Sequence, residues 1–241
     1  MKRGKMKREI SDISIGFLFY FIFFAMGFVR AQVPETDLFK EYQPAETSRM
    51  RETIEWTIFY MFDTNDMSKP RVLLIGDSIC NGYQATVHNE LKGKASLSYW
   101  AGSKCVTDPQ YFEELNLVLS SHSYDVITFN NGLHSLSSDR NEWENAYRQA
   151  VLFIRAKMPN AKLLLVTSTP TENPVNSKIS FELGEYAKKV AAELGLGVID
   201  LYDETIKLPD KSPWSDGVHF KAPVVKLQGE AVTNAILEAL P

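Results

Sequence analysis

The stretch Arg71-Val72-Leu73-Leu74-Ile75-Gly76-Asp77-Ser78 is a short apolar run that ends in glycine and two polar residues. A continuous apolar run of this length is typical of a strand buried on both faces of a sheet. Further strand-like runs follow at residues 125–129, 162–167 and 197–201, and a weaker one at 96–100. Helical patterns separate or follow the later runs, at residues 142–157, 177–194 and 222–240. This alternation predicts an α/β fold, a three-layer αβα sandwich around a five-stranded parallel sheet.

The N-terminus has the pattern of a secretory signal. Basic residues crowd positions 2–8, an uncharged apolar run of 17 residues follows at 13–29, and a V-x-A pattern precedes a possible cut after Ala31. This order predicts a signal peptide over residues 1–31 and export to the periplasm or the extracellular space. The alternative is an N-terminal anchor that is not cleaved.

Two further segments follow the expected signal. Residues 32–69 are expected to form an extension with a helix over 47–61, because Ile54, Ile58 and Met61 would share one face of it. Residues 70–241 are expected to form the main domain.

Charge and composition exclude several classes of protein. The net charge is −4 for the whole chain and −8 for residues 32–241. We therefore expect neither binding to nucleic acid nor a stable association with membranes after signal cleavage. Two cysteines cannot make a four-thiolate zinc site, and the four histidines have no metal-ligand spacing. We expect no metal and no cofactor.

Chemically useful side chains follow three of the expected strands. Ser78 comes directly after the first strand, where helix N–H groups could stabilise an oxyanion; the alternative is a turn in which Ser78 caps the helix. Asn130 directly follows the 125–129 strand, where its amide could donate into the same crevice or serve a turn. Asp216 and His219 lie three apart after the last strand, which suits a carboxylate that orients an imidazole, or an ordinary surface pair. Because the carboxyl ends of parallel strands share one edge, all of these groups are expected at one site.

These blocks resemble those of the GDSL-type, or SGNH, hydrolases. Gly76-Asp77-Ser78-Ile79 is similar to the family's first block and Asp216-Gly217-Val218-His219 to its last, and the resemblance covers about residues 71–240. It implies a sheet in flavodoxin-like order and catalysis without a metal. It also implies that Ser78 is the nucleophile, His219 the general base and Asp216 its orienting acid. The implied oxyanion hole consists of the backbone N–H groups of Ser78 and Gly102 and the side chain of Asn130.

The middle blocks depart from the family pattern. Trp100 stands where the second block usually has asparagine, and the third block reads FNNGLH at residues 129–134, so Asn131 is an alternative oxyanion donor. This form of the third block is similar to that of secreted bacterial relatives that act on acylated carbohydrate. Asn131, His134, Trp100 and Trp214 are therefore possible substrate contacts, although packing roles are equally open for the two tryptophans.

Two smaller expectations concern the rim of the site. Cys80 and Cys105 lie close to the first two blocks, so a disulfide between them is expected, with two unpaired thiols as the alternative. Residues 169–180 are expected to form a loop that shapes specificity.

Together these features predict an exported serine esterase that hydrolyses short acyl esters, acetyl above all, on a small molecule or an oligosaccharide. The alternatives are a lipid acyl-hydrolase, such as a lysophospholipase or thioesterase, and a carbohydrate-binding protein on the same scaffold without turnover.

Overall fold

The structure is a computed structural model, and it describes residues 49–209 and 212–241. The expected signal peptide and residues 32–48 of the expected extension lie outside the described residues. The elements, in chain order, are β1 (Thr57–Met61), β2 (Arg71–Gly76), α2 (Ser78–Leu91), β3 (Ser96–Gly102), α3 (Tyr111–Ser120), β4 (Val126–Phe129), the 3-10 turn η1 (Leu133–Ser135), α4 (Arg140–Lys157), β5 (Lys162–Val166), α5 (Pro174–Leu194), β6 (Gly197–Ile199), α6 (Leu201–Ile206) and α7 (Ala222–Ala239).

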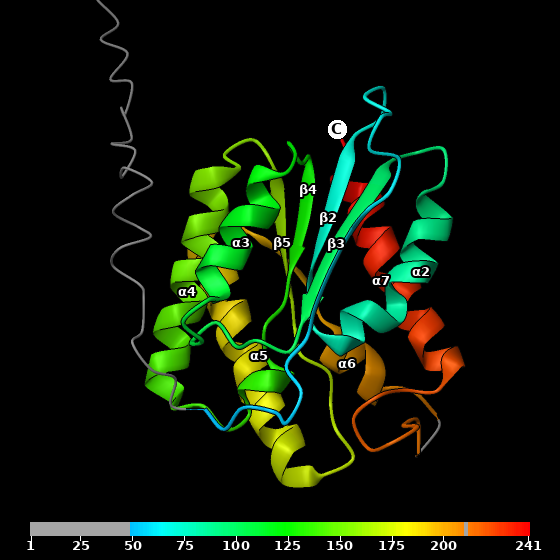
Figure 1. Ribbon diagram of the computed structural model, residues 1–241. Coiled ribbons are helices and arrows are strands. Elements are labelled where there is room, and N and C mark those ends of the chain that lie inside the picture. The colour runs from blue at the N-terminus through cyan, green and yellow to red at the C-terminus, as the bar shows by residue number, and fades with distance from the viewer. Residues whose placement is uncertain (1–48, 210–211) are drawn as a thin grey trace, which may run out of the picture. The chain divides into compact units, whose positions relative to one another are not determined.

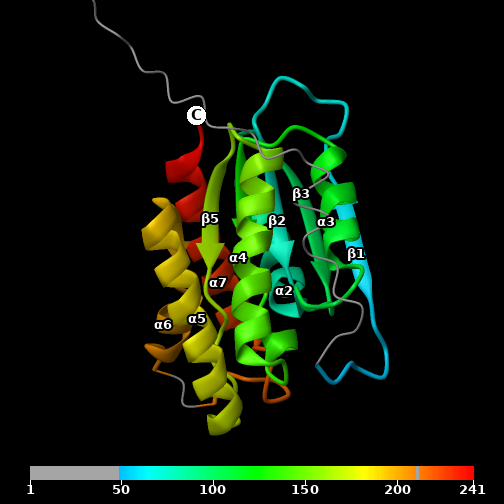
Figure 2. The same cartoon turned by 90° about the vertical axis from the view of Figure 1, so that its left-hand side faces the viewer.

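Six strands form one sheet in the order β1-β3-β2-β4-β5-β6, and only β1 is antiparallel to its neighbour. The five parallel strands have the flavodoxin-like order, with the second strand outside the first, as the resemblance implies. Chain connections therefore leave β2 and β4 in opposite directions, and in such sheets the ligand site lies at that switch point, beyond the carboxyl ends of the strands. Figure 2 shows the arrowheads of β2 and β5 pointing the same way.

Helices cover both faces of the sheet, which confirms the predicted αβα sandwich. In Figure 1, α3, α4 and α5 lie on one side of the strands, and α2, α6 and α7 lie on the other. Strand β2 shows why its run is continuously apolar. Leu73 and Ile75 pack into the cluster beneath α3, α4 and α5, whereas Val72 and Leu74 pack against α2 and α7. Residues 72–75 of β2 are therefore apolar on both faces, and Arg71 at its start is buried with its guanidinium bonded to the carbonyls of Phe62 and Asp63.

Local sequence signals set the helix ends. Helix α5 begins after Asn173, whose Oδ1 accepts hydrogen bonds from the N–H groups of Val175 and Asn176, and Pro174 occupies its first turn. It ends at Gly195, whose φ of 66° suits glycine. Among the described residues, no helix is both long and apolar enough to span a bilayer.

The helix expected over residues 47–61 is wrong. The segment Thr57–Met61 is instead strand β1, paired with β3 from Thr57 opposite Gly102 to Met61 opposite Ser98. The helical spacing misled because Ile54 is 75% exposed and does not belong to a buried face, while the run TIFYM consists of residues that favour strands. The sheet therefore has six strands rather than five.

The loop expected over residues 169–180 is shorter than predicted, because α5 already begins at Pro174. Helix α3 was also missed, although its buried residues recur with helical spacing. They are Tyr111, Phe112, Leu115, Val118 and Leu119.

Candidate active site

Ser78 is the first residue of α2 and stands directly beyond the carboxyl end of β2. The preceding Asp77 is the helix N-cap, and its Oδ1 accepts a 2.9 Å hydrogen bond from the Ile79 N–H. Ser78 is therefore not the cap, and its hydroxyl is free for another role. The turn is tight, since a Cβ on Gly76 would approach the Cβ of Cys80 to 2.6 Å. Glycine at position 76 is what allows the strand to pass directly into the helix.

The structure brings His219 to Ser78 from 141 positions along the chain, with Nε2 of His219 2.8 Å from Oγ of Ser78. On the other side of the ring, Nδ1 lies 2.7 Å from Oδ2 of Asp216. A carboxylate can only accept, so Nδ1 carries the proton that it shares with Asp216. In the neutral imidazole Nε2 is then an acceptor, positioned for the hydroxyl proton of Ser78.

The carboxylate of Asp216 is held in its ionised form by three donors. Its Oδ1 accepts from the backbone N–H of His219 at 2.8 Å and from that of Val218 at 3.1 Å. These bonds and the imidazole, the His219 N–H foremost, lower the pKa of Asp216 to about 2. Asp216 is therefore charged throughout the neutral range and can stabilise an imidazolium beside it.

A short hairpin carries both residues. Backbone hydrogen bonds join Lys221 N–H to Pro213 C=O at 2.9 Å and Ser215 N–H to His219 C=O at 2.8 Å. Gly217 turns the chain with a φ of 86°, a conformation that favours glycine. We refer to residues 213–221 as the acid–base hairpin. The side chains of its acid and base are open to solvent, with His219 46% and Asp216 56% exposed.

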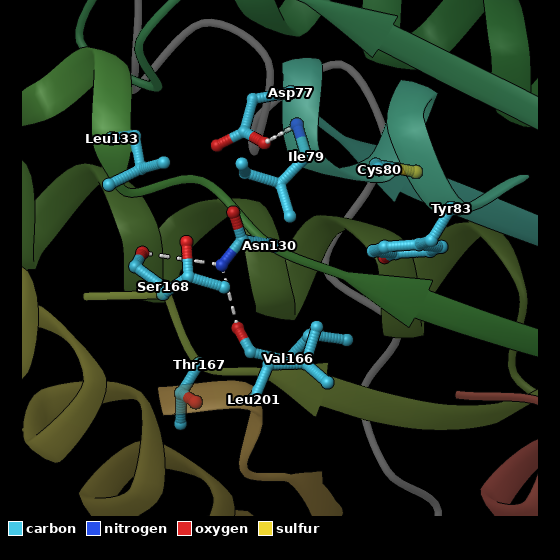
Figure 3. A pocket seen from close by; sticks show the side chains of 11 residues that line it. Asp77, Ile79, Cys80, Tyr83, Asn130, Leu133, Val166, Thr167, Ser168 and Leu201 are labelled. Carbon is cyan, nitrogen blue, oxygen red and sulfur yellow. Dashed lines mark hydrogen bonds between the residues drawn. The ribbon is translucent and has the colours of Figure 1, made fainter. Parts of the chain in front are cut away.

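Asn130 lies at the carboxyl end of β4, as predicted, but its amide is directed to β5. Its Nδ2 donates to the carbonyl of Val166 at 2.8 Å and approaches Oγ of Ser168 at 3.4 Å (Figure 3). Both amide hydrogens thus have acceptors on the β5 side. The role of Asn130 as an oxyanion donor stays a prediction.

Asn131 serves a structural purpose. Its Oδ1 accepts from the Val106 N–H at 3.0 Å and from Oγ of Ser135 at 3.1 Å, and its Nδ2 donates to the Lys104 carbonyl at 2.8 Å. This side chain fastens the loop after β3 to the turn after β4. With its amide fully engaged, Asn131 is neither a free oxyanion donor nor a free substrate contact in this structure.

Gly102 ends β3 opposite Thr57 of β1. A Cβ at this position would approach the carbonyl oxygen of Trp56 to 3.1 Å, so the close approach of the chain just before β1 is a reason for glycine here. The role of the Gly102 N–H in the oxyanion hole stays a prediction.

Trp100 is not available as a sugar platform. It is 4% exposed, donates from Nε1 to Oγ1 of Thr57 at 2.9 Å and packs on Tyr111 in the core. His134 is also occupied, because its Nδ1 lies 2.5 Å from Oε1 of Glu52 and its ring packs edge-on against Trp56. Both side chains therefore have packing roles.

The expected disulfide does not form, and both thiols are free and buried. Cys80 belongs to the cluster beneath α2 and α7, whereas Cys105 belongs to the cluster on the opposite face of the sheet. The sheet between them prevents the sulfur atoms from meeting. Burial raises the pKa of the Cys80 thiol to about 12, so it is no nucleophile at neutral pH.

A small pocket lies beside the nucleophile turn, between the start of α2 and the ends of β4 and β5 (Figure 3). Asp77 and Ile79 line it, whereas Ser78 between them does not. The described residues contain no cluster of three or more side chains that could hold a metal ion.

No protein-family profile and no curated protein sequence matches the chain. Solved structures do match. A lipase/acylhydrolase from Enterococcus faecalis is 23% identical, with a TM-score of 0.56 over 71% of this chain and 97% of that one. An acetyl xylan esterase is 19% identical, with a TM-score of 0.58 over 69% and 99%. A member of the lipolytic G-D-S-L family from Veillonella parvula is 17% identical, with a TM-score of 0.59 over 69% and 98%. The chain has the fold of these proteins.

Proposed function

We propose that this protein is a member of the GDSL (SGNH) hydrolase family that cleaves carboxylic esters, with Ser78 as nucleophile, His219 as general base and Asp216 as its orienting acid. One observation carries the proposal. A continuous chain of hydrogen-bonding groups runs from Oγ of Ser78 through the imidazole to Asp216, with steps of 2.8 Å and 2.7 Å. Such a chain activates a serine hydroxyl on many unrelated folds.

The steps follow from this geometry. Oγ of Ser78 attacks the ester carbonyl carbon while Nε2 of His219 takes the hydroxyl proton, and Asp216 stabilises the resulting imidazolium. Collapse of the tetrahedral anion releases the alcohol, which takes the proton from Nε2, and leaves an acyl-serine. Water then attacks the acyl-serine with the same base, and Ser78 and a carboxylic acid are released.

The oxyanion would lie at the start of α2, where the N–H groups of the first turn have no acceptor within the helix. The N–H groups of Ser78 and Gly102 are the proposed donors. Asn130 would act as a third donor only by exchanging the Val166 carbonyl for the oxyanion.

We propose a short acyl group, acetyl above all, as the part transferred, and a carbohydrate as the alcohol. Two observations support this. His219 and Asp216 are 46% and 56% exposed, so a bulky alcohol can approach the triad from solvent. One of the structures with this fold is an acetyl xylan esterase. Export through the N-terminal signal is proposed from the sequence and would bring the enzyme to extracellular glycans.

A second candidate is a carbohydrate-binding protein on this scaffold that has lost turnover. The engagement of the Asn130 amide with β5 favours it, because loss of one oxyanion donor costs about a hundredfold to a thousandfold in rate.

The deciding experiment compares acetate release from acetylated xylo-oligosaccharides by the wild type and by Ser78→Ala. We expect the substitution to lower kcat/KM at least about a thousandfold. Ser121→Ala is the matched control, since this exposed hydroxyl donates to the Leu117 carbonyl at the end of α3.

A fluorophosphonate should label the wild type at Ser78. Equal acetate release by the wild type and Ser78→Ala would contradict the proposal, and glycan binding without labelling or release would support the second candidate.

A further inference from the structure

The acid–base hairpin sets its own internal geometry but not its distance from Ser78. The two backbone bonds of the hairpin and the bonds to Asp216 all lie within residues 213–221. The Ser78 hydroxyl lies on α2, 141 positions before His219 in the chain. Contacts outside the hairpin must therefore hold it where Nε2 of His219 is within hydrogen-bond distance of Oγ of Ser78.

Two hydrogen bonds tie the hairpin to the segment between β5 and α5. The indole Nε1 of Trp214 donates to the Pro170 carbonyl at 3.2 Å. The backbone N–H of Glu172 donates to the Gly217 carbonyl at 2.8 Å, directly between Asp216 and His219 in the chain. The hairpin is thus attached to this segment at its base and at its tip.

The segment that receives these bonds is itself firmly held. Thr169 and Thr171 are 1% and 3% exposed. The Thr169 carbonyl accepts from Oγ of Ser180 at 2.7 Å, and Oγ1 of Thr171 donates to the Asn173 carbonyl at 3.0 Å. The bonds therefore connect the hairpin to a fixed part of the sheet edge.

Trp214 joins this anchor to the helix layer. Its ring packs on Phe220, with centroids 6.2 Å apart, and Phe220 is 6% exposed in the cluster beneath α2 and α7. The half-buried indole thus contacts the segment after β5 with its nitrogen and the core residue Phe220 with its ring.

We propose that Trp214 is a positioning residue for His219, which holds the imidazole within reach of Ser78 through its bond to the Pro170 carbonyl, and that it does not serve as a sugar platform. The inference rests on the proposed function, because it concerns the same base. A displacement of a reacting group by about 1 Å can lower the rate about a hundredfold. Loss of one of the two hydrogen bonds between the hairpin and the segment after β5 should therefore lower kcat.

The test is Trp214→Phe, which keeps an aromatic ring against Phe220 and removes the N–H. We expect kcat to fall about tenfold with KM unchanged, and fluorophosphonate labelling of Ser78 to slow by the same factor. Trp143→Phe is the matched control, since the Trp143 Nε1 is buried on α4 without a partner among the described residues. It should leave both rates unchanged. Trp214→Met is a second variant that also lacks a donor for the Pro170 carbonyl, to be used if Trp214→Phe does not fold.

Wild-type kcat in a folded Trp214→Phe would overturn the inference, and so would a raised KM with unchanged kcat, which would place Trp214 on the substrate. Failure of the proposed function gives a different result, namely no turnover and no labelling by the wild type. In that case the imidazole NMR signals of His219 test whether Trp214 positions the ring beside Ser78. Ser78→Ala should shift them in the wild-type background but not in the Trp214→Phe background, and an equal shift in both backgrounds would overturn the inference.

Discussion

Asp216 shows how a single exposed side chain can be held in one charge state. More than half of its surface is open to solvent, yet three donors within the next three residues face its two oxygens. The local turn, rather than burial, therefore keeps the orienting carboxylate ionised.

The pKa of Asp216 gives a prediction at this scale. We expect its carboxyl carbon signal in NMR to titrate at about 2, below the ordinary value of 3.8. Because the folded pKa is depressed, the bonds contribute stability above pH 3.8 and lose it as the pH falls through about 2. In His219→Ala the backbone donors remain, so the pKa should rise only in part. Full return to the ordinary value would show that the imidazole alone lowers it.

At the scale of elements, the site depends on where helices begin. Asp77 caps α2 and so frees the hydroxyl of Ser78, and Asn173 caps α5 directly after the segment that holds the acid–base hairpin. Sequence reasoning missed Asp77 as the cap, although aspartate immediately before a first helical turn is a common signal. It also missed the anchoring role of Trp214, because no local pattern encodes a bond to Pro170, 44 positions away.

The cap of α5 gives a prediction of its own. Asn173→Ala removes the acceptor for two backbone N–H groups and should lower the free energy of unfolding by about 1 kcal/mol. Asn173→Asp keeps an acceptor oxygen and is the control. Urea denaturation of the three proteins measures the effect, and equal midpoints for the alanine variant and the wild type would contradict it.

At the scale of the whole molecule, a buried ion pair attaches the segment before β1 to the loop after β3. Nε of Arg49 donates to Oδ1 of Asp108 at 2.9 Å, and the two residues are 4% and 1% exposed. The Arg49 guanidinium also meets Glu55, whose Oε2 accepts from Oγ of Ser103 at 2.7 Å. This network holds the loop after β3, which carries the Lys104 carbonyl that Asn131 binds.

Removal of either partner of the Arg49–Asp108 pair should therefore lower the stability of the fold strongly. Asp108→Ala leaves a buried guanidinium without its main partner, and we expect the free energy of unfolding to fall by about 3–5 kcal/mol. Arg148→Ala is the control, because the Arg148–Glu193 pair is 37% and 42% exposed and such pairs contribute at most about 1 kcal/mol. A loss for Asp108→Ala no larger than that of the control, measured by denaturant unfolding, would contradict the structural role of the pair.

The sequence alone determined the αβα sandwich, the five parallel strands and the nature of Ser78, Asp216 and His219 as candidates. These features depend on local periodicity and on the rule that parallel strands share one carboxyl edge, so short stretches of sequence encode them. Only the tertiary structure decided the strand at residues 57–61, the separation of Cys80 from Cys105 and the engagement of the Asn130 amide with Val166. Each of these depends on what lies across the sheet or on the next strand. Such contacts join positions far apart in the chain. The strand-favouring residues of the run TIFYM were a local signal for β1, but its pairing with β3 and the other two features have no local pattern.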